Sequence, residues 1–326
     1  MQKNKFILVT GAAGFIGFHL SKKLLDQGFS VVGVDNFNDY YSVKLKLARA
    51  DILNQYPNFI QKKLNISDMT ELDKIFKQFN FSVVAHLAAQ AGVRYSLTHP
   101  MVYEQSNLAA FLNILEAVRH NSVPRLVYAS SSSVYGGNEK MPFSESDRVD
   151  DPVSLYAATK KANELMAHSY SHLFGFQTIG LRFFTVYGPW GRPDMAMWLF
   201  AKAILNSKPI NVFNYGKMKR DFTYIDDIIK GVNAAMFNDN LDMYEIFNLG
   251  NHKSEQLLEM IELIENELNM KAEKNFMPLQ PGDVPESYAD INKAMEKLDF
   301  QPQTSINQGV PNFIKWFKEH KQFHHI

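Results

Sequence analysis

The feature that most constrains the fold is a glycine-rich turn near the N-terminus, in the stretch VTGAAGFIG. It follows the short apolar run KFILVT and precedes a segment with a helical pattern, so the glycines fall between a strand and a helix. Gly11, Gly14 and Gly17 have the spacing G-x-x-G-x-x-G. Such glycines permit a tight turn and let the backbone approach a pyrophosphate at a helix N-terminus. The turn predicts a dinucleotide site, with close packing of helix on sheet as the alternative.

Strand and helix patterns alternate over the first 185 residues. This alternation predicts a parallel sheet covered by helices on both faces. After Phe184 the chain passes through a loop rich in glycine and proline, and then mixes short strands, helices and turns. We therefore expect an α/β fold with a Rossmann-like, doubly wound parallel sheet in residues 1–185. Residues 186–326 are expected to form a smaller mixed lobe for the substrate, with some segments returning to the first domain.

Composition and charge exclude several classes of protein. Lys plus Arg and Asp plus Glu each number 34, so there is no electrostatic case for nucleic acid or an anionic membrane. The chain has no cysteine, which excludes disulfides, thiolate metal sites and cysteine nucleophiles. His168 and His172 lie one helical turn apart without a third ligand, so no metal site is predicted. No apolar run approaches the ~20 residues of a membrane helix, and we expect a cytoplasmic protein.

An aspartate at the end of the second expected strand indicates which dinucleotide is bound. Asp35 closes the run VVGVD, 18 residues beyond Gly17. A carboxylate at this place can bind the adenosine ribose hydroxyls, and it repels the extra phosphate of NADP. The next residue is Asn36 and not an arginine. The sequence therefore favours NAD, although an aspartate in a turn or a helix cap would look the same.

A tyrosine and a lysine lie four residues apart in SLYAATKK, at Tyr156 and Lys160. Four residues along a helix rise ~6 Å and return to the same face. A tyrosine with a pKa of about 10 is a poor base, but a nearby ammonium and a positive nicotinamide ring both favour the phenolate. The serine tract YASSSSVYGG supplies a hydroxyl at Ser131, and Asn107 can hold a water or a backbone turn near the lysine. We interpret the pair as a base with its electrostatic partner, the alternative being an ordinary helix opening.

Several motifs together resemble those of a known family. TGAAGFIG, HLAAQAGVR, YASSSSVYGG, YAATK and LRFFTVYGP are similar to motifs of the extended short-chain dehydrogenase/reductases. DNFNDYYSVKLK, GPWGRPDMA, KRDFTYIDDI and PGDVPESYAD resemble the nucleotide-sugar 4-epimerases, and UDP-glucuronate 4-epimerases most of all. The motifs run from Gly11 to Asp290 and so cover nearly the whole chain. The stretch GRPDMA after FFTVYGPW is the most discriminating among them.

The resemblance implies roles for individual residues. Tyr156 corresponds to the catalytic base, Lys160 to its electrostatic partner and Ser131 to the proton-relay hydroxyl. The residues expected to contact NAD are Gly11, Gly14, Phe15, Ile16, Gly17, Asp35, Asn36, Asn65, Ile66, Leu87, Ala88, Ala89, Asn107, Tyr156 and Lys160. The residues expected to contact the substrate are Arg94, Ser131, Ser132, Ser133, Thr185, Arg192, Arg220 and Asp283. Asn65 departs from the family pattern, which often has an acidic residue near the adenine.

The implied reaction is a 4-epimerisation of a UDP-sugar through a 4-keto intermediate, most simply between UDP-glucuronate and UDP-galacturonate. NAD is regenerated in each turnover and is expected to stay tightly bound. The 4-keto uronate is a β-keto acid, and it decarboxylates when its carboxylate bond aligns with the ketone π system. Thr185, Ser132, Ser133 and Arg192 are placed by the resemblance to prevent this alignment. For Arg192, a solvated arginine in a surface loop is the other interpretation.

Three alternatives remain open. A UDP-galactose or UDP-N-acetylhexosamine 4-epimerase needs the same hydride chemistry. A 4,6-dehydratase or a decarboxylating relative typically has an acidic residue near the serine tract, and SSSSVYG has none. A non-catalytic dinucleotide sensor would not need Ser131, Tyr156 and Lys160 together. The family also implies a homodimer, whose interface would be formed by the helices expected at Leu108–His120 and Thr159–Phe174.

Overall fold

A seven-stranded parallel sheet forms the centre of the molecule, in a computed structural model that describes residues 5–280 and 282–326. Its strand order is β11-β6-β5-β4-β1-β2-β3. The predicted doubly wound sheet is thus confirmed, because the order reverses between β1 and β4, where such sheets bind ligands. The strands are β1 (Phe6–Thr10), β2 (Val31–Asp35), β3 (Phe59–Lys63), β4 (Phe81–His86), β5 (Arg125–Ser131), β6 (Gln177–Phe183) and β11 (Tyr244–Leu249).

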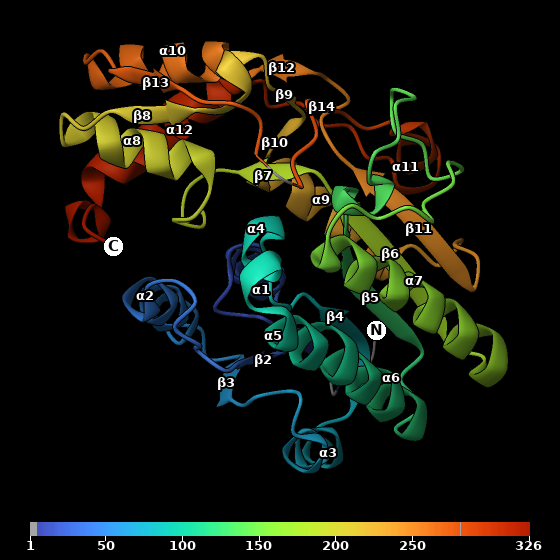
Figure 1. Cartoon of the computed structure of the whole chain (residues 1–326). Coiled ribbons are helices and arrows are strands. Elements are labelled where there is room, and N and C mark those ends of the chain that lie inside the picture. The colour runs from blue at the N-terminus through green and yellow to red at the C-terminus, as the bar shows by residue number, and fades with distance from the viewer. Residues whose placement is uncertain (1–4, 281) are drawn as a thin grey trace.

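Helices cover both faces of this sheet (Figure 1). One face packs against α1 (Phe15–Asp26), α2 (Val43–Leu53) and α9 (Ile225–Phe237). The other face packs against α3 (Met69–Gln78), α6 (Ala110–His120) and α7 (Leu155–Phe174). Successive side chains of a strand point to opposite faces, so Ile7 and Val9 enter the first core while Leu8 enters the second. A strand buried on both faces has to be apolar along its centre, as residues 6–9 of β1 are.

The helix expected at Leu108–His120 becomes a regular α-helix only at Ala110, where α6 begins. The chain before it forms α4 (Val93–Thr98), α5 (Pro100–Tyr103) and a π-helical segment, η1 (Glu104–Ala109). Leu108 is half-buried and Leu112 is 41% exposed. Leu112 follows Phe111 directly and so points about 100° away from it. Ile114 takes the buried position instead.

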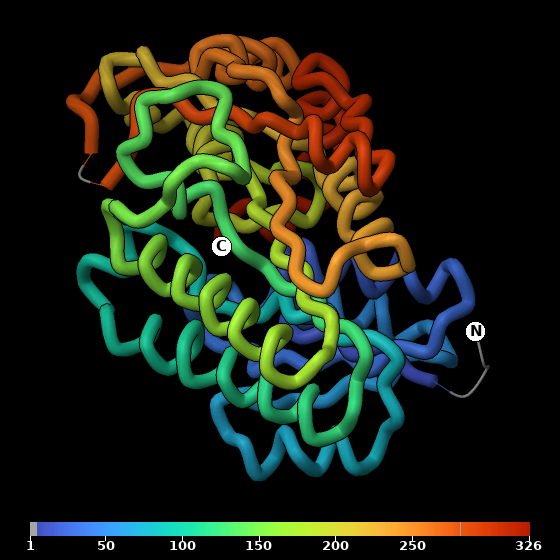
Figure 2. The backbone as a smooth tube through the Cα atoms, turned by 90° about the vertical axis from the view of Figure 1, so that its right-hand side faces the viewer, coloured from blue at the N-terminus to red at the C-terminus, as the bar shows by residue number. Residues whose placement is uncertain are grey.

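The C-terminal part forms a smaller lobe above the carboxyl ends of the strands, coloured yellow to red in Figures 1 and 2. Its apolar layer includes Phe313, Trp316 and Phe317 of the last long helix, which is therefore packed against the lobe. The lobe has a two-stranded parallel pair β8–β13, a second pair β7–β10 and a small sheet of order β12-β9-β14. Its elements are β7 (Thr185–Tyr187), α8 (Ala196–Leu205), β8 (Ile210–Val212), β9 (Lys219–Arg220), β10 (Phe222–Tyr224), β12 (Glu255–Gln256), α10 (Leu257–Leu268), β13 (Lys274–Phe276), β14 (Glu286–Ser287), α11 (Asn292–Leu298) and α12 (Ile306–Glu319).

Segments cross between the two parts in both directions. From the C-terminal part, α9 and β11 join the layers of the large sheet. From the N-terminal part, the loop after β5 rises to the lobe, where Phe143 N donates to Tyr288 O at 3.0 Å. The boundary between residues 185 and 186 remains a prediction.

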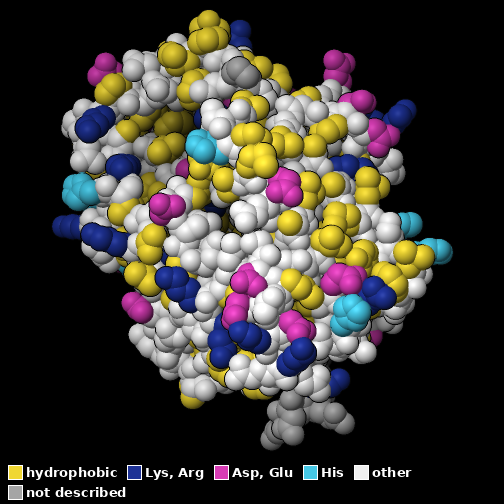
Figure 3. Space-filling model, turned by 60° about the horizontal axis from the view of Figure 1, so that its bottom comes forward, with side chains coloured by type: hydrophobic (Ala, Val, Ile, Leu, Met, Phe, Trp, Pro, Cys, Tyr) yellow, Lys and Arg dark blue, Asp and Glu magenta, His cyan; other side chains and the backbone are white. Residues whose placement is uncertain are grey.

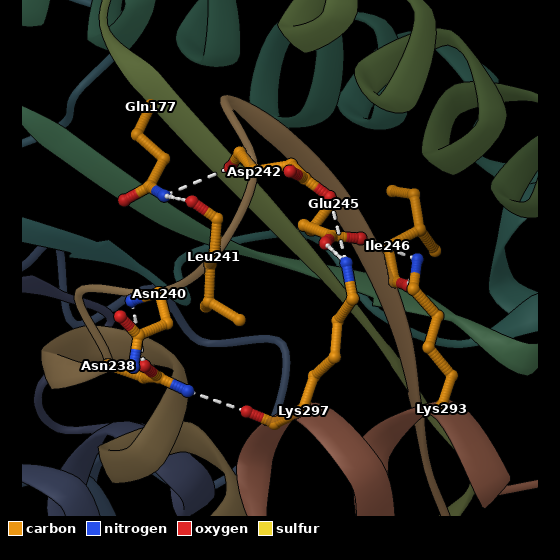
Figure 4. A network of polar contacts seen from close by, with 9 residues as sticks. All are labelled: Gln177, Asn238, Asn240, Leu241, Asp242, Glu245, Ile246, Lys293 and Lys297. Atoms are coloured by element: carbon orange, nitrogen blue, oxygen red, sulfur yellow. Dashed lines mark hydrogen bonds and ion pairs between the residues drawn. The ribbon is translucent and has the colours of Figure 1, made fainter.

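Ion pairs and amide hydrogen bonds fasten the outermost strand, β11, as Figure 4 shows. Gln177 Nε2 donates to the carbonyl of Leu241 at 2.8 Å, just before the strand begins. Lys297 of α11 pairs with Asp242 at 2.8 Å and with the buried Glu245. Lys293 of the same helix donates to Ile246 O at 2.9 Å. An exposed sheet edge is a template for unwanted pairing, and α11 covers this one.

The surface carries both signs of charge. Lysines, arginines and acidic residues are interspersed on the face shown in Figure 3, as the zero net charge requires. Within the described residues, no helix is both long enough and apolar enough to cross a membrane.

Candidate active site

A cavity of about 1150 Å³ lies between the carboxyl ends of the sheet strands and the C-terminal lobe. Ligand pockets for drug-sized molecules have volumes of about 300–1,000 Å³, so this cavity has room for more than one such group. It is lined by every residue predicted to contact NAD or the substrate, with the exception of Asn107. The fold therefore brings the predicted site residues together, although their individual roles remain predictions.

The glycine-rich turn leaves no room for side chains. Gly11 has φ +71°, in the left-handed region, and a Cβ there would lie 2.8 Å from Ala88 N. A Cβ on Gly17 would lie 2.1 Å from Gly11 O. Gly14 caps α1, so the free N–H groups of the first turn of that helix face the cavity. The turn fits a dinucleotide pyrophosphate, which needs close backbone approach and the positive end of a helix.

Asp35 ends β2 at the cavity wall, where it also shapes the turn. Its Oδ2 accepts from Ala13 N at 3.1 Å, and its Oδ1 accepts from Phe37 N at 2.9 Å. Lys46, which the sequence did not single out, lies beside it and donates to the Asn38 carbonyl at 2.7 Å. Burial lowers the pKa of Lys46 to about 8, against the opposite effect of Asp35. These groups fit the adenosine ribose of a dinucleotide.

The predicted base and its partner share one face of α7. Ser154 caps the helix, accepting from Ala157 N at 3.1 Å, and thereby places Tyr156 in its first turn. Lys160 is 2% exposed and donates to Ala129 O of β5 at 2.8 Å. Ser131 ends the same strand. Strand β5 and helix α7 thus bring the three predicted catalytic residues to one wall of the cavity.

The hydroxyls near the base form a connected set. Ser131 Oγ donates to Ser133 Oγ at 3.0 Å and accepts from Ser133 N at 3.2 Å. Ser132 begins the following 3-10 turn, η2 (Ser132–Tyr135), and lines the cavity as well. The ring of Tyr103 packs edge-on against Tyr156, with centroids 6.0 Å apart. Tyr156 is therefore held in place by a packed ring beside a row of hydroxyls.

Burial opposes ionisation of both members of the pair. It raises the pKa of Tyr156, whereas hydrogen bonding with Ser131 and the positive charge of Arg192 lower it. Burial also lowers the pKa of Lys160 to about 8, against the charge of Glu164. Lys160 donates to a neutral backbone carbonyl, which leaves its charge in place, and its effect on the tyrosine pKa remains a prediction. Ser131 and Arg192 also favour the phenolate.

Asn107 is buried and does not line the cavity, so its contact with the cofactor remains a prediction. Its Oδ1 accepts from Gln90 N at 2.8 Å, and its Nδ2 donates to Gln90 O at 3.1 Å and to Thr159 Oγ1 at 3.1 Å. It belongs to the π-helical segment and is 2% exposed. Asn107 therefore holds the backbone at Gln90, as one of the two predicted roles requires. Its bond to Thr159, the residue before Lys160, places this part of the chain near the lysine.

Arg192 lies on the cavity wall and not on a solvated surface loop. Its side chain is 21% exposed, and its Nε donates to Asp194 Oδ1 at 3.1 Å. The hydroxyl of Tyr40 donates to Asp194 Oδ2 at 3.0 Å. Thr185, the first residue of β7, lines the same cavity. The guanidinium is therefore already paired, in an arrangement that the sequence did not predict.

Two further predicted substrate residues contact each other across the cavity. Arg94 Nη2 of α4 donates to Asp283 Oδ2 at 2.9 Å and stacks over the ring of Phe213 at 5.1 Å. Arg220 donates to the carbonyls of Lys219 at 2.8 Å and Pro285 at 3.2 Å. These three residues lie where the C-terminal lobe meets the sheet.

In residues 5–280 and 282–326, no group of three or more His, Asp or Glu residues is arranged to hold a metal ion.

Residues 7–250 match the model of the NAD dependent epimerase/dehydratase family. The chain belongs to this family. Protein CapI of Staphylococcus aureus is 50% identical to it, over 96% of this chain and 98% of CapI. UDP-glucuronate 4-epimerase 4 of Arabidopsis thaliana is 47% identical, over 95% of this chain and 75% of the plant protein. The crystal structure of UDP-glucuronic acid 4-epimerase from Bacillus cereus, in complex with UDP-glucuronic acid and NAD, has a TM-score of 0.91 and 36% identity, covering 96% of this chain and 99% of that chain.

Membership of the epimerase/dehydratase family confirms the resemblance inferred from the motifs. The structure adds site residues that motif reading did not single out. Tyr40, Lys46 and Asp194 line the cavity, and Arg49 donates to the carbonyl of Gly191 next to it. Lys46 and Arg49 lie three residues apart on α2, and both are buried, which their charge did not predict.

Proposed function

We propose that this epimerase/dehydratase-family member is an NAD-dependent UDP-sugar 4-epimerase that interconverts UDP-glucuronate and UDP-galacturonate. The observation that carries the proposal is the cluster of Ser131, Tyr156 and Lys160 on the wall of a cavity that also contains the glycine-rich turn. The turn and Asp35 would hold NAD, which when bound takes a hydride from carbon 4 of the sugar and returns it. Relatives named as UDP-glucuronate 4-epimerases support the choice of sugar.

The chain supplies the proton chemistry in this proposal. Tyr156 accepts the proton of the sugar 4-hydroxyl and gives it back, and Ser131 and Ser133 form a hydroxyl path beside it. Tyr156 is half-buried on the cavity wall, and its burial raises the tyrosine pKa. The Ser131 hydrogen bond and the charge of Arg192 partly offset that effect. Lys160 fixes the end of β5 against α7 through Ala129 O.

A uronate substrate requires hydrogen-bond donors that hold its carboxylate in place. Thr185, Ser132 and Ser133 line the cavity and can donate hydroxyl hydrogen bonds to it. Arg192 lies on the same wall, but it is already paired with Asp194. That pair favours a second candidate, a 4-epimerase of a neutral UDP-hexose or UDP-N-acetylhexosamine, which needs no cation at this position.

Product analysis separates the two candidates. Purified protein is incubated without added cofactor with UDP-glucuronate, UDP-glucose and UDP-N-acetylglucosamine, and the epimers are resolved by chromatography. Bound nucleotide is released by acid and identified in parallel. We expect NAD and a 4-epimer of UDP-glucuronate. Preferential turnover of a neutral sugar would favour the second candidate, and NADP as the main bound species would contradict the cofactor assignment.

We also infer that the enzyme acts as a homodimer in the cytoplasm. Large apolar side chains are exposed on the helices of one side of the sheet: Met101 by 72%, Leu112 by 41%, Leu165 by 58% and Leu173 by 68%. These residues belong to α5, α6 and α7, which pack side by side. Exposed apolar side chains gathered on one helix layer are typical of protein interfaces. A second copy of the chain is the partner that we propose.

A further inference from the structure

A buried arginine in the segment after β2 has no part in the proposed chemistry. Arg49 of α2 is 0% exposed. Its Nη1 donates to Ala13 O at 2.8 Å and to the Tyr41 hydroxyl at 2.8 Å. Its Nη2 donates to Trp190 O at 2.6 Å and to Gly191 O at 3.0 Å. None of these four acceptors is a carboxylate, although a buried charge is normally paired with one.

The acceptors of Arg49 belong to two different parts of the site. Ala13 lies in the glycine-rich turn, and its own N–H is held by Asp35. Trp190 and Gly191 directly precede Arg192, which lines the cavity. The guanidinium of Arg49 thus joins the glycine-rich turn to the loop that carries Arg192 on the cavity wall.

The loop needs this support because its own backbone conformation is unfavourable. Trp190 has φ +59°, in the left-handed region that side chains such as tryptophan rarely adopt. His19 of α1 hydrogen-bonds the Pro189 carbonyl through Nε2 at 3.0 Å, and burial lowers the pKa of His19 to about 4. The ring of Trp190 packs on Phe18, with centroids 5.6 Å apart. The loop is therefore held from outside, by side chains of α1 and α2.

The far end of the loop is attached to the same segment. Tyr40, which lies between β2 and α2, donates to Asp194 at 3.0 Å, and Asp194 in turn binds Arg192. Arg192 is thus bracketed by contacts that reach it from residues 40–49. A shift of the backbone at residues 190–191 would move its guanidinium relative to Tyr156.

We propose that Arg49 is a positioning residue that clamps the loop Trp190–Asp194 to the glycine-rich turn and thereby sets the place of Arg192 in the cavity. The planar guanidinium of Arg49 donates to two carbonyls of the loop and to one carbonyl of the turn. A lysine ammonium is a point charge on a flexible stem and cannot hold all of these acceptors in the same geometry. The activity part of its test rests on the proposed function, but the test of the clamp does not.

The test compares Arg49→Lys with Arg125→Lys in the purified holoenzyme. Arg125 is a matched control, because it is also buried and donates to the backbone carbonyls of Met236 at 2.7 Å and Asn238 at 2.9 Å, outside the cavity. Hydrogen exchange of the backbone amides in residues 188–196 is measured by mass spectrometry. We expect exchange about tenfold faster or more in Arg49→Lys and unchanged exchange in Arg125→Lys. Equal exchange in both variants would overturn the clamp.

A double-mutant cycle tests whether Arg49 acts through Arg192. We expect Arg49→Lys to reduce kcat/KM for UDP-glucuronate by about ten- to a hundredfold, and to have little further effect in an Arg192→Met background. Additive losses would show that Arg49 supports the fold alone, and loss of bound NAD with normal exchange at residues 188–196 would show that it acts only on the cofactor turn.

If Arg49→Lys does not fold, Tyr40→Phe releases the other end of the loop, and normal exchange at residues 192–196 would overturn the proposal. A wild-type protein without epimerase activity would contradict the proposed function and leave the exchange result valid.

Discussion

At the scale of single residues, the proposed base is Tyr156, a weak base whose pKa is raised further by its surroundings. Burial raises the pKa of Tyr156, whereas Ser131 and Arg192 lower it. The lysine four residues further along is itself kept by burial at a pKa of about 8. The tyrosine therefore depends on its hydroxyl neighbour and on the charges that reach the cavity when ligands bind.

Replacing Tyr156 with phenylalanine should remove the proton acceptor while keeping the ring that packs on Tyr103. General acid–base catalysis contributes about 10²–10⁴-fold, so we expect turnover to fall by that factor. Bound NAD should remain at the wild-type level. Turnover is followed by chromatography of the sugar nucleotide and occupancy by acid release, and near-normal turnover would show that Tyr156 is only a helix residue.

Ser131→Ala should change the pH dependence of the reaction. The Ser131 hydrogen bond lowers the pKa of Tyr156, so its loss raises that pKa and less phenolate is present at a given pH. The acidic limb of the kcat/KM profile should therefore move to higher pH, with a deficit that grows on the acidic side. Ser131→Thr keeps a hydroxyl and should restore much of the wild-type profile. A deficit of the same factor at every pH would argue against this role.

At the scale of elements, the junction of β1 with α1 is the most tightly specified part of the fold. The carbonyl of Gly11 lies where a Cβ of Gly17 would have to be, at 2.1 Å. Real Cβ atoms do not approach a backbone oxygen so closely. The first turn of α1 can therefore reach the cavity only with glycine at residue 17.

Gly17→Ala should accordingly displace α1 from the turn and weaken the dinucleotide site. We expect the purified variant to retain much less NAD than wild type. Gly137→Ala is the matched control, because its nearest contact would be Val153 Cγ1 at 3.9 Å, and it should retain NAD normally. Equal retention by both variants would contradict the assignment of the cofactor to this turn.

At the scale of the whole molecule, the helix layer on one side of the sheet exposes large apolar side chains on its outer surface. The helices α5, α6 and α7 leave Met101, Leu112, Leu165 and Leu173 in solvent. Burying such side chains stabilises an assembly by about 25 cal/mol for each Å² of apolar surface removed from water. This side is where we place the second copy of the chain.

Leu165→Glu should weaken that assembly, because a buried carboxylate without a partner is unfavourable. Sedimentation velocity should show a shift from dimer toward monomer at micromolar protein concentration. Leu47→Glu is the control, since Leu47 is 47% exposed on α2, on the opposite face of the sheet. A wild-type monomer, or the same shift in both variants, would contradict the interface.

Local spacing explains what the sequence could predict, and contacts between distant segments explain what it could not. The glycine turn, Asp35 and the pair Tyr156 and Lys160 were predictable because a strand end or a helical turn fixes their geometry. The bonds from Tyr40 to Asp194 and from Arg49 to Trp190 link residues more than a hundred positions apart, and no periodicity reports such a contact.

The orientation of the Asn107 side chain has a local cause. A π-helical segment precedes α6, and such segments add a residue to a helical turn and so rotate the side chains around it. A 3.6-residue pattern does not anticipate that rotation. Asn107 consequently faces Gln90 and not the cavity.

The central claim is that carbon 4 of a UDP-uronate loses and regains its hydrogen inside this cavity. The most direct measurement follows deuterium at that carbon, with UDP-glucuronate labelled at carbon 4 and incubated in ordinary water with the purified protein and no added cofactor. The account predicts UDP-galacturonate that retains the deuterium at carbon 4, because the removed hydride returns to the same carbon without exchange. Loss of the label to solvent, or recovery of unconverted UDP-glucuronate alone, would contradict the account.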